Sequence, residues 1–407
     1  MLALAMWRWF GGCGGLDYSA AAFIRPWQLV RRRLASLMGI RDTVRILGMG
    51  NPLLDVSASV PDTLLTKYGL EPNNAILAEQ RHRPLVRELR DAYAADYVAG
   101  GATQNAIRVA QWMLQRPGST AYFGAVGNDD FAERMRQAAR RDGVHVQYRV
   151  DENEPTGTCA VLVTSNGQCR SLVADLGAAN TYKIEHLRHP DQWQLVEAAK
   201  LFYIAGFFLT VSVESALAIG EHVAQNADKT FCMNLSAPFL LQVPEYWNHF
   251  CAVQPFVDVY FGNETEACAL AKRMGLIDDA ACEALTRAQL FEVATALATK
   301  TPKRTSRPRT VVFTCGADPI VLVIGDGERL WSTSEYGVIP CPDNDVVDTN
   351  GAGDAFVGGF LAMMALGRPI VECVAAGNYA ANVVIRQPGC TFPPKPHFRY
   401  RGVQVLV

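Results

Sequence analysis

The chain has 407 residues and a formal net charge of −2, with 38 Lys and Arg against 40 Asp and Glu, and 49% of its residues are hydrophobic. This composition excludes global disorder, and the near-neutral charge argues against a general nucleic-acid coat. At about 150 residues per domain, the length allows two to three domains or one large α/β domain with additions. The longest apolar run, residues 201–211, is about half of the roughly 20 residues that a membrane-spanning helix needs.

The first 43 residues differ in composition from the rest. They contain six Arg, no Lys and two acids, which is a net charge of +4, whereas residues 44–407 carry −6. An Arg-rich, acid-poor start is typical of organelle targeting, but this segment is poor in Ser and is interrupted by two glycine pairs. We expect residues 1–43 to be a basic extension, either disordered or targeting, that precedes a body over residues 44–407.

From residue 44 onward, short apolar runs alternate with segments of helical periodicity. Buried strands are expected at residues 44–50, 121–126, 201–205, 231–235, 257–261, 310–314 and 320–323. Helices are expected at residues 103–115, 129–141, 211–224, 352–366 and 370–385. This alternation predicts an α/β fold, with a mostly parallel sheet and helices on both faces.

Two stretches break the alternation. Residues 56–60 and 159–173 have the pattern of extended hairpin strands, the second with a turn at 165–168, and they predict a small β lid over the site. The basic, Pro-interrupted segment 300–309 is interpreted as a solvated surface loop, with a nuclear address or an anion patch as the alternatives.

The 11 cysteines are scattered along the chain without a CxxC pair. In a chain of this length the pattern indicates reduced, mostly buried thiols in a cytosol-like compartment. Neither a disulfide framework nor a zinc site is expected.

The strongest motif is at residues 348–356, which read Asp-Thr-Asn-Gly-Ala-Gly-Asp-Ala-Phe. Small residues let the backbone turn tightly into a helix that begins near Ala352. The N–H groups of that first turn, with the positive end of the helix dipole, form an anion site. We therefore predict a phosphate group at Gly351, Ala352 and Gly353, with Asp354 as the base for a substrate hydroxyl.

Two other nucleotide-binding motifs are excluded. Residues 348–356 lack the GxxxxGK[ST] pattern of a Walker A loop. The Gly48-Met49-Gly50 turn lacks the third glycine of a dinucleotide-binding loop, since position 53 is Leu.

Residues 348–356 match the second signature of the ribokinase-like (PfkB) family of sugar and nucleoside kinases. Further matches occur in the same order along the chain, at residues 48–55, 100–105, 155–159, 205–210, 234–238, 261–266 and 389–393. Together they span about residues 44–395, and the chain thereby resembles the adenosine kinases of that family. The resemblance implies one ribokinase-like domain over residues 44–407, with lid segments near 54–62, 95–101 and 157–176.

The resemblance also implies an activity: ATP-dependent phosphorylation of the 5′-hydroxyl of adenosine to AMP, with ADP as the second product, in purine salvage. We expect a monomer in the cytoplasm, with the nucleus as an additional location, that has the small-molecule substrates adenosine and ATP and no nucleic-acid or membrane partners. A kinase of another nucleoside or of a sugar, and a catalytically inactive nucleoside sensor, are the alternatives. The presence of Asp354 argues against the sensor.

Individual roles follow from the matched motifs. Ribose and base contacts are implied for Asn51, Leu53, Asp55, Leu77, Gly101, Asn105, Leu172, Ala174 and Phe208. Arg170 matches a lid arginine that reaches the transferring phosphoryl group. ATP contacts are implied for Asn234, Asn263, Glu266, Thr314, Gly316 and Asn378. Asn263 and Glu266 are expected to orient Mg²⁺ through its phosphate and water ligands, and a monovalent cation is a further expectation.

Overall fold

The computed structural model describes residues 44–72, 74–164, 169–278, 284–400 and 405–406. The extension expected at residues 1–43 and the turn expected at 165–168 lie outside the described residues. In the part of the chain that is described, no helix is both long enough and apolar enough to cross a membrane.

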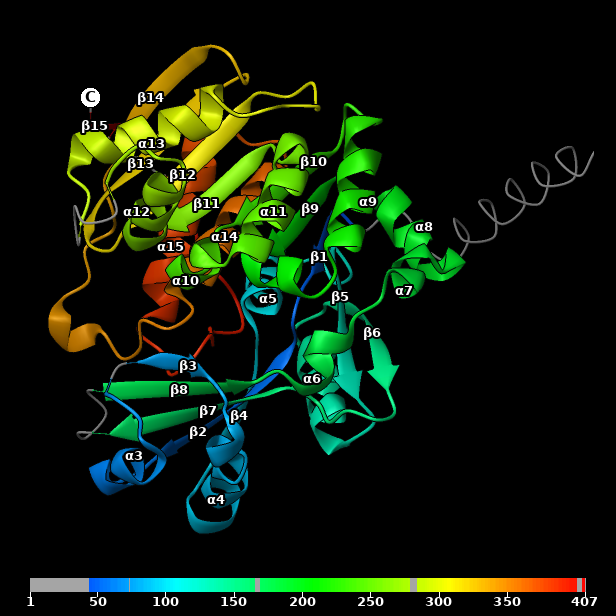
Figure 1. Cartoon of the computed structure of the whole chain (residues 1–407), viewed down its shortest axis with the longest axis vertical. Helices are drawn as coiled ribbons and strands as arrows, with labels where there is room; N and C mark the ends of the chain where they lie inside the picture. Colours follow the sequence, from blue (N-terminus) through cyan, green and yellow to red (C-terminus); the bar gives the residue numbers. More distant parts are fainter. Residues whose placement is uncertain (1–43, 73, 165–168, 279–283, 401–404, 407) are drawn as a thin grey trace, which may run out of the picture. The chain divides into compact units, whose positions relative to one another are not determined.

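Ten strands form the larger sheet, in the spatial order β15-β14-β13-β12-β11-β10-β9-β1-β5-β6 (Figure 1). Their bounds are β1 (Ile46–Met49), β5 (Thr120–Gly127), β6 (His145–Asp151), β9 (Leu201–Ala205), β10 (Thr230–Asn234), β11 (Val259–Asn263), β12 (Arg309–Cys315), β13 (Asp318–Gly325), β14 (Leu330–Tyr336) and β15 (Val405–Leu406). The strands from β12 to β6 run parallel to one another. Strands β13, β14 and β15 extend the sheet in antiparallel pairs.

Helices cover both faces of this sheet. One face packs against α5 (Ala102–Leu114), α6 (Asp130–Arg141), α14 (Ala352–Ala365) and α15 (Ile370–Val384). The other packs against α7 (Ile184–Arg188), α8 (Pro190–Ala198), α9 (Val213–Ala224), α10 (Pro238–Gln242), α11 (Pro244–Val253), α12 (Glu264–Arg273) and α13 (Arg287–Thr299). Side chains alternate between the two cores along each strand, so Ile46 enters one core and Leu47 and Met49 enter the other.

A second sheet of five strands has the order β3-β8-β7-β2-β4 (Figure 1). Its strands are β2 (Leu53–Ser59), β3 (Ala75–Leu77), β4 (Asp96–Gly100), β7 (Thr158–Thr164) and β8 (Cys169–Asp175). Side chains such as Val56, Leu162 and Val173 pack against α3 (Asp62–Tyr68) and α4 (Leu85–Ala92). Because side chains alternate along a strand, the residues between them point to the opposite face, where the pocket described below lies.

The predicted fold class is confirmed, and the predicted elements lie within about two residues of the observed ones. The segments expected as hairpin strands belong to the second sheet, in which β7 and β8 pair antiparallel and β2 pairs parallel to β7. The order is not that of a simple hairpin, because β2 and β7 are far apart in the chain.

The basic segment 300–309 differs from its interpretation as a solvated loop. The Arg309 side chain is fully buried, and its guanidinium donates to the backbone carbonyls of Gln254, Val257, Leu297, Thr301 and Pro302. The Lys303 ammonium forms a buried ion pair with Asp258 at 2.8 Å. The carbonyl groups of the neighbouring loops require donors when they are buried, and this segment supplies them. The charges of Arg309 and Lys303 are therefore unavailable to an external receptor or anion, whereas Lys300 and Arg304 are exposed.

Candidate active site

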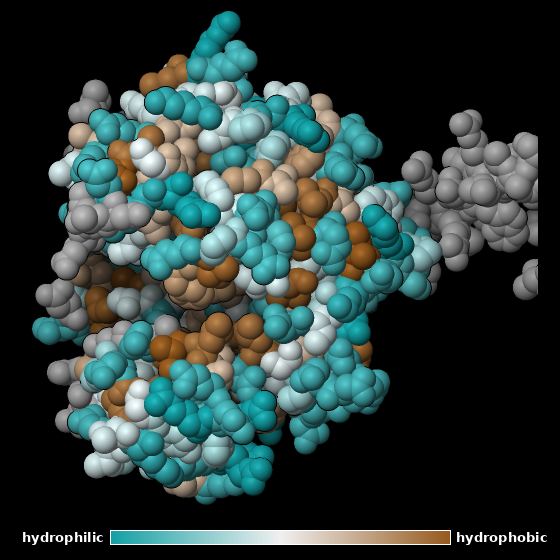
Figure 2. Space-filling model, viewed as in Figure 1, coloured by the Kyte–Doolittle hydropathy of each residue, from teal (hydrophilic) through white to brown (hydrophobic). Residues whose placement is uncertain are grey.

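A pocket of about 500 Å³ lies between the second sheet and the first turns of α5 and α14. Figure 2 shows apolar side chains gathered around a hollow at this place. Ten of the predicted site residues line it: Leu53, Asp55, Leu77, Gly101, Asn105, Arg170, Leu172, Ala174, Gly351 and Asp354. Residues separated by up to 301 positions in the chain thus meet at one site.

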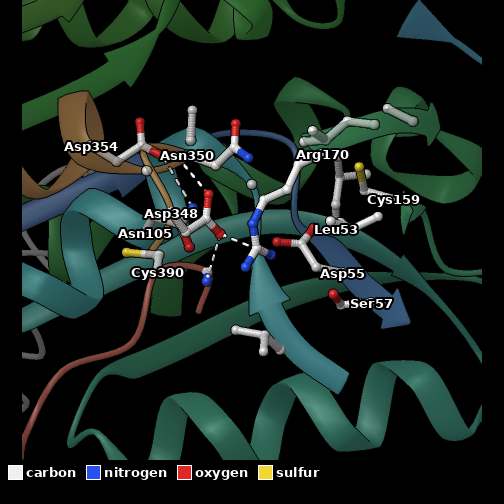
Figure 3. A pocket seen from close by; sticks show the side chains of 18 of the residues that line it. Leu53, Asp55, Ser57, Asn105, Cys159, Arg170, Asp348, Asn350, Asp354 and Cys390 are labelled. Carbon is white, nitrogen blue, oxygen red and sulfur yellow. Dashed lines mark hydrogen bonds and ion pairs between the residues drawn. The ribbon is translucent and has the colours of Figure 1, made fainter. Parts of the chain in front are cut away.

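Close packing of two helices sets the catalytic end of the pocket. A Cβ atom at Gly358 of α14 would lie 2.5 Å from the carbonyl oxygen of Ala106 on α5, so only glycine permits this approach. Since both helices start at the pocket, their first turns also meet. There the Asn105 amide nitrogen donates to an Asp354 carboxylate oxygen at 3.0 Å (Figure 3).

Asp354 is placed and tuned by the start of α14. Gly351 precedes the helix with φ of 80°, a left-handed conformation that glycine adopts without strain, and Asp354 follows in the first turn. Burial raises the pKa of Asp354 to about 7, and the charge of Glu266 acts in the same direction while the hydrogen bond from Asn105 opposes it. A carboxylate in this state is a stronger base than an exposed aspartate.

The predicted anion site at this helix start is only partly available. The N–H of Ala352 donates to the Thr349 carbonyl at 3.2 Å, so this donor closes the turn and does not face the pocket. The space beside Gly353 is open, because nothing described lies within 4 Å of where its Cβ would be. The N–H groups of Gly351 and Gly353 are the remaining candidates for binding an anion.

Arg170 lies on β8 of the second sheet, and its side chain extends across the pocket toward the segment that precedes α14. Its guanidinium forms an ion pair with Asp348 at 3.2 Å, and the Asp348 carboxylate also accepts from the N–H groups of Asn350 and Gly389 at 2.9 and 2.8 Å (Figure 3). Asp348 is 4% exposed, so these three donors satisfy a buried charge. Sequence reasoning did not assign Asp348 a role, although it begins the strongest motif.

Asp55 lies in the middle of the pocket on β2, between Leu53 and Ser57 (Figure 3). Burial raises the pKa of Asp55 to about 7, Arg108 opposes this rise, and the charges of Asp354 and Asp348 add to it. The pocket therefore contains two carboxylates that both titrate near neutral pH.

The asparagines predicted to contact the ribose are buried nearby. Asn51 does not line the pocket; its amide nitrogen contacts the Ala179 carbonyl at 3.5 Å. Among the described residues, the side-chain oxygens of Asn51 and Asn105 have no hydrogen-bond partner. Buried polar atoms are nearly always paired, so the Asn105 oxygen, whose residue lines the pocket, is suited to receive a hydroxyl group of a ligand.

An apolar wall forms the far end of the pocket. Its members are Leu53, Ile76, Leu77, Val161, Leu172, Ala174, Phe207 and Phe239. The assignment of Phe208 to this wall is wrong: Phe208 is 0% exposed and packs in the core against Tyr182. The 3₁₀ turn Gly206–Thr210 points Phe207 into the pocket instead. Sequence alone does not reveal which of two adjacent phenylalanines faces the site.

The residues predicted to contact ATP lie outside this pocket. Asn234 and Asn263 end the parallel strands β10 and β11, and Thr314 pairs with Asn263, so three of them share the carboxyl edge of the sheet. Gly316 follows β12, and Asn378 on α15 donates to the Gly337 carbonyl at 3.0 Å. The carboxyl edge is where ligands bind in open α/β sheets.

Asn263 and Glu266 form a capping box at the start of α12. Asn263 Oδ1 accepts from the Glu266 N–H at 2.8 Å, and Glu266 Oε2 accepts from the Asn263 N–H at 3.0 Å. Burial raises the pKa of Glu266 to about 7. The described residues contain no group of three or more acidic, His or Cys side chains that could hold a metal. One carboxylate and one amide fit Mg²⁺ that is held mainly by phosphate and water.

Comparison with known proteins gives a consistent result. Residues 62–397 match the family model described as pfkB family carbohydrate kinase. Adenosine kinase 1 of Arabidopsis thaliana is 51% identical over 355 residues, covering 87% of this chain and 97% of the relative. The adenosine kinase of Dictyostelium discoideum is 42% identical over 358 residues, covering 87% of this chain and 99% of the relative.

Solved structures agree. The Anopheles gambiae adenosine kinase in complex with P1,P4-di(adenosine-5) tetraphosphate has a TM-score of 0.77 and 45% identity, over 87% of this chain and 98% of that one. The Schistosoma mansoni adenosine kinase in complex with adenosine and AMP has a TM-score of 0.74 and 32% identity, over 86% and 97%. The chain therefore belongs to the PfkB family of carbohydrate kinases and, within it, to the adenosine kinases.

Proposed function

We propose that this protein transfers the γ-phosphoryl group of ATP to the 5′-hydroxyl of adenosine, giving AMP and ADP. The observation that carries the proposal is the placement of the Asp354 carboxylate, which faces the pocket from the first turn of α14 and is oriented by Asn105. The kinship with adenosine kinases supports adenosine as the acceptor, and the apolar wall suits a purine better than a free sugar.

Asp354 is the general base in this mechanism. One carboxylate oxygen accepts the Asn105 amide, so the other is free to take the proton of the 5′-hydroxyl. Because the pKa of Asp354 is raised to about 7, the base has a basicity close to the operating pH. The hydroxyl oxygen then attacks the γ-phosphoryl group in line.

The ribose is held next to this base. The Asp55 carboxylate accepts from the two hydroxyls of the vicinal diol, and the Asn105 side-chain oxygen is a further acceptor. The purine lies against the apolar wall, where burial of its faces supplies affinity without specific charge.

Charge on the transferring group is stabilised by the N–H groups of Gly351 and Gly353 and by Arg170. For this role the Arg170 guanidinium exchanges its ion pair with Asp348 for phosphoryl oxygens, which its planar fork also fits. When bound with ATP, Mg²⁺ supplies charge neutralisation at the phosphates, and Asn263 and Glu266 would orient its water ligands. The second sheet acts as a lid that keeps water from the reacting groups.

We further infer the setting of this activity. Residues 44–407 are the kinase body with its lid segments at 54–62, 95–101 and 157–176, and residues 1–43 are an extension. The protein acts in purine salvage as a monomer in a cytosol-like compartment. Buried thiols such as Cys232 and Cys373 support a reducing compartment. Light scattering of the purified protein tests the monomer.

The decisive experiment measures ATP-dependent AMP formation by the purified protein, with inosine, ribose and fructose beside adenosine. We expect strong preference for adenosine, and Asp354→Asn should lower kcat by about 10²–10⁴-fold while the Kd for adenosine changes little. Equal turnover of a free sugar would reject adenosine as the substrate. Near-normal kcat in Asp354→Asn would show that another group is the base.

A further inference from the structure

Arg108 occupies a position that the proposed mechanism does not use. It lies on α5 one turn after Asn105, so both side chains project from the same side of the helix. Arg108 is 6% exposed, and arginines are rarely buried unless polar partners hold them. Arg108 lies beyond the matched motif at residues 100–105, which therefore implies no role for it.

The Arg108 guanidinium holds two segments of the pocket wall. Nη1 donates to the carbonyl of Ala99 at 2.7 Å and to the carbonyl of Cys390 at 3.2 Å. Ala99 precedes the Gly100-Gly101 turn between β4 and α5, and Cys390 belongs to the wall segment 388–391. One side chain thus joins two stretches of backbone that are almost 300 residues apart in the chain.

The far side of the guanidinium is fixed by an ion pair. Nε donates to Asp142, at the end of α6, at 2.6 Å, and the Phe392 ring lies 5.5 Å from the guanidinium carbon. A planar group with donors in several directions can serve these three acceptors at once, whereas a lysine ammonium on a flexible stem serves them less well.

The Asp55 carboxylate of β2 packs against the end of β4 that Arg108 holds. Gly100 follows Ala99, and a Cβ atom at Gly100 would overlap the Asp55 carboxylate, so this carboxylate lies directly against the Gly100 backbone. Strands β2 and β4 are paired here, with Leu54 opposite Ala99. A shift of the Ala99 carbonyl therefore moves the surface on which Asp55 rests.

Arg108 also acts on Asp55 through charge. It is the group that lowers the pKa of Asp55 against the effect of burial. The other titratable or charged groups around Asp55 are Asp348 and Asp354 at the start of α14, Cys159 on β7, Cys390, and the pocket-lining Asp96, Tyr97 and Arg170.

We propose that Arg108 is a positioning residue for ribose recognition, because it fixes the backbone on which the Asp55 carboxylate lies. The inference rests on the proposed function, in which Asp55 binds the ribose diol. It adds a specificity determinant outside the pocket lining: Arg108 sets how well the site distinguishes a nucleoside with a vicinal diol from one without it.

The test compares adenosine with 2′,3′-dideoxyadenosine as ligands, by calorimetric Kd from pH 6 to 9, in wild type, Arg108→Met, Arg108→Lys and Asp55→Asn. Arg108→Met should weaken adenosine binding about tenfold at pH 7 and change dideoxyadenosine binding far less. Part of the loss should recover toward pH 9, where Asp55 ionises without help. Arg108→Lys should keep the wild-type pH profile and lose part of the preference for adenosine. KM for adenosine should change more than kcat.

Asp142→Asn is the matched control, because it removes the ion pair and leaves the Arg108 charge and carbonyl contacts in place. It should retain the preference for adenosine. Equal weakening of both nucleosides in Arg108→Met, independent of pH, would mean that Arg108 supports only the fold. If Arg108→Met does not fold, an unchanged preference in Arg108→Lys overturns the proposal.

Failure of the proposed function gives a different result. If wild type forms no AMP from adenosine and ATP, the function itself is in error. If wild type shows no preference for adenosine over dideoxyadenosine, or Asp55→Asn retains it, then Asp55 does not bind the diol and the role of Arg108 falls with it, whereas the phosphoryl transfer stands. If Asp55→Asn loses the preference while both Arg108 variants keep it, only the role of Arg108 is rejected.

Discussion

Asp55 and Asp354 share one pocket, and burial raises the pKa of each to about 7. In the proposed mechanism both must be ionised, Asp354 to accept a proton and Asp55 to accept the diol. A carboxyl whose pKa is raised is protonated below that value, so lowering the pH removes both functions together.

We expect kcat/KM for adenosine to fall as the pH is lowered from 8 to 5, and more steeply than about tenfold per pH unit because two groups protonate. Initial rates across this range test the profile. Asp55→Asn should reduce the steepness to that of one ionisation. A flat profile down to pH 5.5 would contradict the raised pKa values.

Among elements, the contact between α5 and α14 decides whether Asn105 meets Asp354. Gly358→Ala places a methyl group 2.5 Å from the Ala106 carbonyl, so the helices must separate. We expect the free energy of unfolding to fall by about 1–3 kcal/mol and kcat to fall on the order of tenfold. Gly337→Ala is the control, since nothing described lies within 4 Å of its Cβ position. Unchanged kcat in Gly358→Ala would show that the contact is not needed.

Substitutions in segment 300–309 test what this segment contributes to stability, and they leave the residues of the active-site pocket unchanged. Arg309 is fully buried at the amino end of β12, whereas Arg304 is exposed beside Phe256. Arg309→Met leaves several buried carbonyls without a donor and should lower the free energy of unfolding by about 3–5 kcal/mol. Arg304→Met should cost less than about 1 kcal/mol. Denaturant titrations measure both, and similar losses would refute the structural role of the segment.

At the scale of the whole molecule, the ionised Asp354 carboxylate that serves catalysis lowers the stability of the folded state. An unfolded aspartate titrates near 3.8, whereas folded Asp354 titrates at about 7, so the folded state holds more protons between these values. Its contribution to stability therefore decreases as the pH rises through this window. The same holds for Asp55 and Glu266, whose pKa values are also raised to about 7.

We accordingly expect Asp354→Asn to be more stable than wild type by about 1–3 kcal/mol at pH 8, with the difference vanishing near pH 4. Thermal and urea unfolding at both pH values measure this. Glu328→Gln controls for the loss of a surface charge, because Glu328 is exposed. A stabilisation that is equal at both pH values would rule out ionisation as its cause.

The fold class, most of the parallel strands and the helix starting at Ala352 could be predicted because they depend on local pattern: apolar periodicity and small residues at a helix start. The same holds for the motif that contains Asp354. Three features could not be predicted, because each depends on groups far away in the chain. They are the orientation of Phe207 into the pocket, the ion pair of Arg170 with Asp348 and the burial of Arg309.

The sequence by itself determined which residues are chemically able to act, since the type and order of side chains in the motifs are local properties. Only the tertiary structure decided their state. Asp55 and Asp354 acquire pKa values near 7 because distant elements bury them together. Arg108, an ordinary helix residue in the sequence, joins two pocket walls only once β4, α6 and the 388–391 segment pack around it.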